Sequence, residues 1–327
     1  MPRVYILDVG HGNSTVLVDT AGVLVVDAGS SSALLSFLQE KEIQKIDVLL
    51  ISHADGDHIS GLIGILSEDI EIARIYLNPD RRDTEIWKDL ITVLKDSKDR
   101  GLLGQWNVGL TSELTGNINQ GDITVEVLAP TPQLATVGSG GNDLRGRRIT
   151  PHSMSAVIRL KKDGLPCILL PGDIDEIGLA NLWEEAGDKN ARLLVFPHHG
   201  GNLGLNNDTL TENLCRNVNP EIIIFSIGRG NYNTPLPGIL AKIREILPNV
   251  SIACTQISKS CTLNLPGQQR RYLAPDFARG RETNACCVGT IVIDFEPIFT
   301  LRPVLMDHQA YITAEIPTAL CLRGIRG

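Results

Sequence analysis

Short runs rich in Val, Ile and Leu recur along the chain between Gly, Asn and Asp, a pattern typical of buried strands joined by turns. In the first part of the chain this pattern predicts strands at 4–7, 16–18, 23–26 and 46–51. Further strands are predicted at 123–128, 156–160, 168–170, 193–196 and 222–225.

Apolar residues at helical spacing lie between some of these runs. One predicted helix, which Ser31 or Ser32 would cap, buries four residues: Leu34, Leu35, Phe37 and Leu38. Apolar positions between 239 and 247 predict another helix. Strands mixed with helices, and hairpins at the start of the chain, predict an α/β fold with two sheets covered by helices.

Two stretches depart from this texture. Residues 131–150 are rich in glycine and are expected to form either a flexible surface loop or a lid over a substrate. Beyond residue 265 the chain becomes polar and rich in arginine. We therefore expect a main domain over 1–265 and a C-terminal extension over 266–327 that packs on it.

Composition narrows the class of protein. With 30 basic and 38 acidic residues the net charge is −8, so any contact with nucleic acid must come from a local patch. No apolar run approaches the roughly 20 residues of a membrane helix, and Asp8 leaves no room for a secretory signal. Seven cysteines in a chain of 327 residues do not indicate a disulfide scaffold. We expect a soluble cytoplasmic protein with reduced thiols and no membrane contact, in an oligomeric state that the sequence does not determine.

A dense group of histidine and carboxylate residues follows the strand predicted at 46–51. His53, Asp55, Asp57 and His58 lie within six residues, and such side chains are ligands for zinc, manganese or iron. The alternative is a polar turn that caps a helix. This density of ligands favours a metal site that binds two ions.

Other candidate ligands lie at the ends of later predicted strands. Asp173 follows the strand at 168–170, His198 and His199 follow the strand at 193–196, and His152 precedes the strand at 156–160. Because open sheets place their ligands at strand ends, these residues are expected to join the first group.

In order along the chain, these motifs resemble the metallo-β-lactamase superfamily and, within it, the hydrolase domain of ComEC-type competence proteins. The resemblance covers roughly residues 3–235 and rests on the segments 7–14, 26–29, 53–58, 172–173 and 198–200. It implies a four-layer αββα sandwich and a phosphodiesterase that acts on DNA or RNA.

The resemblance also implies a role for each candidate residue. His53 and Asp55 would hold one ion, Asp57 and His58 the other, and Asp173 would bridge the two. The remaining ligands are His152, at the place of the third motif, and either His198 or His199. Asp27 would orient the histidine cluster. Asp57 and Asp173 are the residues expected to carry the chemistry.

The chain departs from the ComEC-type pattern at two motifs. The family's Gly-Gln-Gly-Asp-Ser is replaced by residues 10–14, Gly-His-Gly-Asn-Ser, and the histidine of its Tyr-x-His-Pro motif is replaced by Thr234. A proton-donating role at this position is therefore not expected, and neither is DNA uptake, because the channel's membrane segments do not occur in the sequence.

The C-terminal part offers a second, independent metal hypothesis. A structural zinc ion is expected to use Cys254, Cys261, Cys286 and Cys287, with buried free thiols as the alternative.

Three hypotheses for the function follow. The first is a hydrolase in which two zinc or manganese ions activate a hydroxide that attacks a nucleic acid, with phosphate contacts from Arg145, Arg147 and Arg148. The second is a hydrolase of a small molecule, such as a cyclic nucleotide or a lactone. The third is a regulatory protein that docks on a partner through its C-terminal extension.

Overall fold

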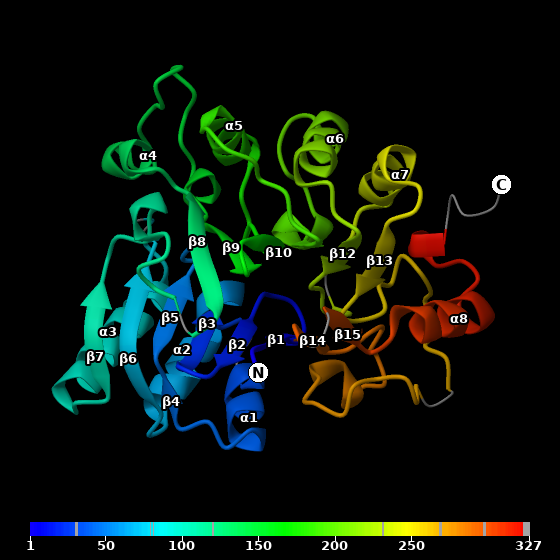
Figure 1. Ribbon diagram of the computed structural model, residues 1–327, viewed down its shortest axis with the longest axis horizontal. Helices are drawn as coiled ribbons and strands as arrows, with labels where there is room; N and C mark the ends of the chain where they lie inside the picture. The colour runs from blue at the N-terminus through cyan, green and yellow to red at the C-terminus, as the bar shows by residue number, and fades with distance from the viewer. Residues whose placement is uncertain are drawn as a thin grey trace.

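The computed structural model describes residues 1–29, 32–78, 80, 82–119, 121–230, 232–267, 270–296 and 299–322. Its strands form two sheets, which Figure 1 shows with helices beside them. Among the described residues no helix is both long enough and apolar enough to cross a membrane.

The first sheet has the order β15-β14-β1-β2-β3-β5-β6-β4, and β7 pairs with β6. Its strands are β1 (Arg3–Ile6), β2 (Thr15–Asp19), β3 (Gly22–Val26), β4 (Lys45–Ile46), β5 (Val48–Ile51), β6 (Glu71–Leu77), β7 (Leu103–Asn107), β14 (Ile291–Asp294) and β15 (Thr300–Arg302). The second sheet has the order β13-β12-β11-β10-β9-β8. Its strands are β8 (Ile123–Ala129), β9 (Val157–Lys162), β10 (Leu165–Leu170), β11 (Leu193–Val195), β12 (Ile222–Phe225) and β13 (Ser251–Cys254).

Helices cover the outer face of each sheet (Figure 1). On the first sheet lie α1 (Ala33–Glu40), α2 (Gly56–Ser67) and α3 (Glu85–Asp99). On the second lie α5 (Glu176–Glu184), α6 (Asn207–Val218), α7 (Pro237–Ile246) and α8 (Leu305–Glu315). The short helix α4 (Pro132–Val137) follows β8 and occupies the start of the stretch predicted as a loop.

Alternation along the strands builds the layers. In β1, Val4 and Ile6 face the second sheet, whereas Tyr5 and, just beyond the strand, Leu7 face the helices of the first. Tyr5 contacts Phe37 of α1 with 4.9 Å between ring centroids. Because successive side chains of a strand point to opposite faces, buried strands with apolar residues on both sides require this arrangement. The predicted α/β fold with two sheets between helical layers is confirmed.

The segment 266–327 takes part in the first sheet. β14 pairs antiparallel with β1, with Tyr5 opposite Val292, and β15 pairs with β14. The sheet is thus built from both ends of the chain.

One local prediction differs from the structure. Ser32 precedes α1, but its backbone is helical (φ −90°, ψ −2°) and its side chain makes no capping hydrogen bond. An N-cap side chain needs an extended backbone to reach the first free N–H groups, which explains the difference. Ser31 lies outside the described residues.

Candidate metal centre

The candidate ligands gather where parallel strands of the two sheets end. β3, β5 and β6 are parallel in the first sheet, and β10, β11 and β12 are parallel in the second. Asp27 and His53 follow β3 and β5, and Asp173 and His199 follow β10 and β11. The carboxyl ends of parallel strands are where open sheets bind ligands, which is why distant motifs meet here.

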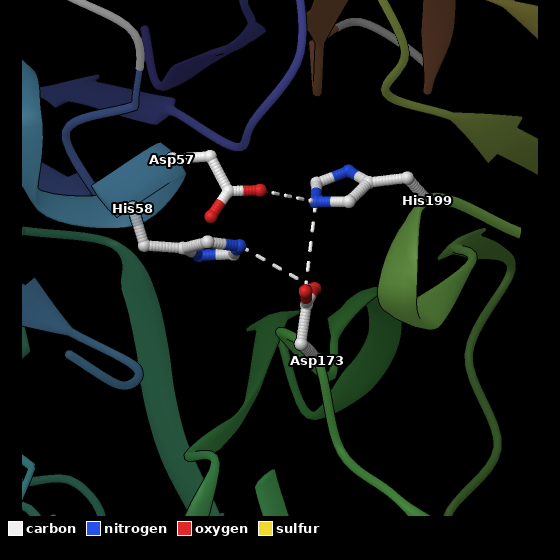
Figure 2. A group of neighbouring side chains, drawn as sticks. All are labelled: Asp57, His58, Asp173 and His199. Carbon is white, nitrogen blue, oxygen red and sulfur yellow. Dashed lines mark hydrogen bonds and ion pairs between the residues drawn. The ribbon is translucent and has the colours of Figure 1, made fainter. Parts of the chain in front are cut away.

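The turn after β5 begins α2 but does not use its carboxylates as caps. Asp55 occupies the N-cap position with an extended backbone, yet its side chain makes no capping hydrogen bond. Instead, Asp55 Oδ2 lies 2.9 Å from His152 Nε2. Asp57 and His58 lie in the first turn of α2 and point away from the helix toward the second sheet (Figure 2). The helix-capping alternative therefore does not account for these side chains.

One group of possible ligands consists of Asp57, His58, Asp173 and His199, whose ligand atoms all lie within 4.8 Å of one another. His199 Nε2 is 3.1 Å from Asp57 Oδ2 and 3.6 Å from Asp173 Oδ2. His58 Nε2 is 3.4 Å from Asp173 Oδ1. Figure 2 shows the two residues of α2 facing Asp173 and His199, which follow strands β10 and β11 of the second sheet.

A second group lies beside the first and shares Asp173 with it. Ligand atoms of His53, His152 and Asp173 lie within 4.8 Å of one another. Asp55 joins this group, because its Oδ2 is also 3.8 Å from His53 Nε2. Two sets of donors with a common carboxylate are the arrangement expected of a site for two ions.

The histidine pair after β11 divides into two different environments. His199 is buried, and its Nδ1 lies 2.7 Å from the carbonyl oxygen of Ser226, so Nδ1 donates and Nε2 is left for a ligand role. His198 is partly exposed, and its Nδ1 is 3.8 Å from Asp173 Oδ2. Its ring stands edge-on to His152 at 4.9 Å between centroids. The geometry favours His199 as the ligand of the first group.

Asp27 holds His58 in place from behind. Its Oδ2 is 2.7 Å from His58 Nδ1, and its carboxylate also accepts hydrogen bonds from the backbone N–H and the hydroxyl of Ser52, at 2.7 and 2.8 Å. With Nδ1 engaged, His58 presents Nε2 to Asp173. This contact is what the orienting role of Asp27 would require, and the role itself stays a prediction.

Several buried polar atoms in the centre have no hydrogen-bond partner among the described residues. They are His53 Nε2, His58 Nε2, Asp173 Oδ1 and His198 Nδ1. Leaving such atoms unsatisfied is costly, and divalent cations would satisfy imidazole nitrogens and carboxylate oxygens together. The residues present therefore fit divalent metal ions.

The electrostatics of the centre favour the presence of positive charge. Burial opposes ionisation of Asp173, but His199 and His58 outweigh it and hold the pKa of this carboxyl well below its usual range. Burial lowers the pKa of His53 to about 3, so its imidazole is neutral near pH 7, as a metal ligand requires. Burial also opposes a charge on His58, yet Asp27 and Asp173 raise its pKa well above the ordinary value. The cluster thus attracts positive charge.

Close backbone packing fixes the start of α2 against two loops. A Cβ added to Gly12 or Gly29 would lie 2.2 or 2.4 Å from the backbone oxygen of Asp57. No side chain fits at such distances, so both positions require glycine. Asp57 is therefore held by main-chain contacts as well as by its side chain.

Two further residues lie at the centre without having been predicted as site residues. His11 Nε2 is 3.4 Å from Asp57 Oδ2, and its ring stacks on Tyr232 at 4.2 Å between centroids. Its position in the departing Gly-His-Gly motif was a usable signal. Arg82 Nη2 is 2.8 Å from Asp55 Oδ1, and no sequence pattern marked this residue.

The arginines predicted as phosphate contacts are largely paired with acidic side chains. Arg145 and Arg147 both contact Glu184 of α5, at 3.0 and 3.1 Å, and Arg147 also contacts Asp143. Arg148 is exposed. A cavity of about 150 Å³ beside Arg145 and Arg147 is lined by no residue of the metal centre.

The four cysteines predicted to hold a structural zinc lie in two different environments. Cys286 Sγ faces Asp8 Oδ2 at 3.6 Å, whereas Cys287 Sγ lies 3.1 Å from His308 Nε2. Cys254, Cys261 and Cys287 line a narrow cavity that is mostly apolar. Among the described residues, however, no three of these sulfur atoms lie within 4.8 Å of one another. Although Cys286 and Cys287 are adjacent in the sequence, their sulfur atoms therefore meet different partners.

Comparisons with known proteins agree with this geometry. In a scan of protein families, residues 7–202 match the metallo-beta-lactamase superfamily. ComE operon protein 3 of Bacillus subtilis (strain 168) is 24% identical over 287 residues, which is 80% of this chain and 32% of that protein. The chain thus spans about a third of the length of this relative.

Two solved structures are similar to this chain at low sequence identity. The metallo-beta-lactamase fold protein YhfI from Bacillus subtilis is 12% identical, with 75% of this chain and 94% of that chain covered and a TM-score of 0.47. The short form of human tRNase Z is 13% identical, with 68% and 91% covered and a TM-score of 0.40. The family match covers more than half of the residues and includes the ligands of both groups, so this chain belongs to the metallo-beta-lactamase superfamily.

Proposed function

We propose that the protein is a metal-dependent phosphodiesterase that cleaves DNA or RNA. The observation that carries the proposal is the pair of His and Asp groups that share Asp173. One ion would be held by His53, Asp55 and His152. The other would be held by Asp57, His58 and His199.

Two divalent ions bound there, zinc or manganese, would lower the pKa of a water molecule and neutralise charge on the group being cleaved. The protein would hold the ligand side chains in fixed positions, so that the two ions bind at defined places. Asp173 would hold both ions from one buried carboxylate. Asp57 Oδ2, between His199 Nε2 and His11 Nε2, would orient the attacking water and accept its proton.

The resemblance to ComEC-type hydrolase domains favours a nucleic-acid phosphodiester as the substrate. Arg82 supports the choice, because its side chain is partly exposed and its Nη2 lies 2.8 Å from Asp55 Oδ1, beside the second group of candidate ligands. A guanidinium matches the geometry of phosphate oxygens. Arg82 would therefore contact a phosphate of the substrate next to the metal centre.

The test is hydrolysis by the purified full chain loaded with zinc or with manganese. Substrates are linear single-stranded DNA, RNA, a panel of cyclic nucleotides and a lactone. We expect cleavage of DNA or RNA that disappears with chelator and in Asp57→Ala, and that persists in the exposed control Asp208→Ala of α6.

The other outcomes separate the parts of the proposal. Hydrolysis of a cyclic nucleotide or the lactone alone would keep the metal-dependent hydrolase and reject the nucleic acid as substrate. No turnover on any substrate, together with only a trace of metal after supplementation, would reject the proposal as a whole.

A further inference from the structure

A cavity of about 270 Å³ lies in the C-terminal part of the chain, apart from the residues of the metal centre. Three arginines and an asparagine line it: Arg270, Arg271, Arg281 and Asn284. No aspartate or glutamate is among its lining residues. A cavity walled by guanidinium groups without a carboxylate has the charge that an anion requires.

Arg270 is the central feature of this cavity. Its residue exposure is only 7%, and its Nε and Nη2 are buried without a hydrogen-bond partner among the described residues. Nη1 donates to Asn284 Oδ1, and the guanidinium carbon lies 5.5 Å from the centre of the Tyr311 ring. A buried guanidinium with two unused donors is costly unless a ligand accepts from them.

One buried acidic side chain close to the cavity wall is already engaged. The Asp8 carboxylate lies behind the cavity wall, where it accepts hydrogen bonds from the Gly280 N–H and the Gln256 side chain, at 2.9 and 2.8 Å. Asp8 is fully buried and does not line the cavity. It therefore does not pair with the three arginines.

We propose that this cavity binds a phosphate group. The unused donors of Arg270, together with those of the exposed Arg271, fit the tetrahedral oxygens of a phosphate, and the exposed Arg281, whose Nη2 donates to the Ala274 carbonyl, adds positive charge to the same cavity. The volume is below the roughly 300 to 1,000 Å³ of pockets that enclose whole small ligands. The occupant is thus a phosphate group, with the rest of its molecule outside.

The phosphate has two sources, a phosphodiester of a nucleic-acid strand or a free phosphate or pyrophosphate. The strand source rests on the proposed function, whereas the phosphate site itself does not. A short segment connects the cavity with the metal centre, because Gly280 of the wall contacts Asp8 and His11 contacts Asp57. The strand source requires that a strand bound at the metal centre also extends to this cavity.

The test measures binding to metal-depleted full-length protein, so that it does not depend on hydrolysis. Titration calorimetry with inorganic phosphate and with pyrophosphate is one arm. Fluorescence anisotropy of a labelled single-stranded oligonucleotide at several salt concentrations is the other. Arg271→Gln is the main variant because the side chain is exposed, and Arg270→Gln is the second, with its fold checked by circular dichroism.

A matched control lies in the same segment. Arg279 belongs to the short 3-10 helix Arg279–Arg281, pairs with Glu282 at 2.9 Å and does not line the cavity. Arg279→Gln removes the same charge only two residues from Arg281.

We expect Arg271→Gln to weaken binding by roughly tenfold and Arg270→Gln by more, while Arg279→Gln binds like wild type. If the variants lose affinity for the oligonucleotide, the slope of log binding constant against log salt concentration should also fall by about 0.7 for each phosphate contact removed. This result would identify a nucleic-acid strand as the source. If the variants lose affinity only for inorganic phosphate and pyrophosphate, the source is free phosphate or pyrophosphate. Equal behaviour of Arg271→Gln and Arg279→Gln in both arms would overturn the proposal, as would a wild type that binds none of the three probes.

Discussion

Two adjacent histidines with the same backbone conformation differ in their use. His198 and His199 both have φ of +53°, in the left-handed region, so the chain turns sharply at the end of β11. The turn sends one ring to the carbonyl of Ser226 and the other to the ring of His152. Residues other than glycine adopt this backbone at a cost, which neighbouring contacts must offset.

From this difference we predict that His199→Ala lowers the metal content of the purified protein from about two ions per chain toward one, and that His198→Ala leaves it nearly unchanged. His199 Nε2 faces both Asp57 and Asp173, whereas His198 Nδ1 reaches only Asp173, at 3.8 Å. Elemental analysis after metal loading measures both contents. The two variants control for each other, and equal losses would contradict the assignment.

Asp173→Ala is expected to reduce hydrolysis by roughly a hundredfold or more, because it removes the carboxylate common to both groups. The loss should come without unfolding, since Asp173 lies after β10 and its removal takes away no apolar contact of the core. Turnover is measured on the true substrate, and melting temperature reports the fold. Near-normal turnover in the variant would refute the two-ion arrangement.

At this scale the sequence predicted the candidate ligands but not their partners. The density of ligands in 53–58 and their position after a buried strand indicated the centre, because few other functions need such spacing. The choice between His198 and His199 depended on backbone dihedrals that no periodicity encodes. Arg82 reaches Asp55 from a segment after β6 with no pattern of its own.

At the scale of elements, most of the buried strands up to residue 225 were predicted, whereas the buried β13 and β14 and the mixed β6 were not. The strands predicted at 4–7, 23–26 and 222–225 are apolar on both faces, which makes them recognisable in the sequence. By contrast β6 (Glu71–Leu77) carries charged residues between its apolar ones, and a run this short does not separate strand from helix. α4 was missed although Pro132 begins it and Thr131 accepts a capping hydrogen bond from Leu134 N.

Asp8, which lies where β1 meets the C-terminal segment, is expected to make the stability of the fold depend on pH. Burial raises the pKa of the Asp8 carboxyl to about 6, although the hydrogen bonds from Gly280 and Gln256 oppose this rise. The folded state therefore holds this proton to higher pH than the unfolded chain does. The resulting stabilisation is fully present below about pH 4 and is lost as pH rises through 6.

Asp8→Asn removes this titration. The difference in free energy of unfolding between wild type and Asp8→Asn should be on the order of 2 to 3 kcal/mol more in favour of wild type at pH 4 than at pH 7. Urea unfolding at both pH values measures it, with Asp208→Asn as an exposed control in α6. A difference that does not change with pH would show that Asp8 does not titrate in this range.

For the whole molecule, the first sheet depends on the end of the chain. Ile291 and Ile293 of β14 pack between the sheets, and Val292 packs toward the helices of the first sheet. Each lost Ile side chain costs about 2 to 5 kcal/mol, so their removal approaches the whole stability of a domain, about 5 to 15 kcal/mol.

Deleting residues 266–327 is accordingly expected to abolish soluble expression or to lower the melting temperature by many degrees. β1 would become an edge strand with unpaired backbone groups, which promotes aggregation. Soluble yield and thermal unfolding of the 1–265 chain measure the effect. A truncated chain as stable as the full one would show that the extension is dispensable for the fold.

The metal centre joins the two sheets, and this has a mechanical consequence. Asp57 and His58 stand on the first-sheet side, and Asp173 and His199 on the second (Figure 2). The spacing between ligands is therefore set by the thickness of the core between the sheets. Ile158 of β9 is fully buried in that core. Its side chain is apolar and is not one of the candidate ligands.

Ile158→Ala should let the sheets approach, shift the two halves of the ligand set relative to each other and so weaken metal binding several-fold, although every ligand residue is still present. Leu94→Ala, in the separate core beneath α3, should cost similar stability without this effect. Metal affinity measured by competition with a chelator distinguishes the two. A side chain that never touches an ion would then act as a spacer between the sheets. Substitutions that change the volume of the core would therefore alter metal affinity without replacing any ligand.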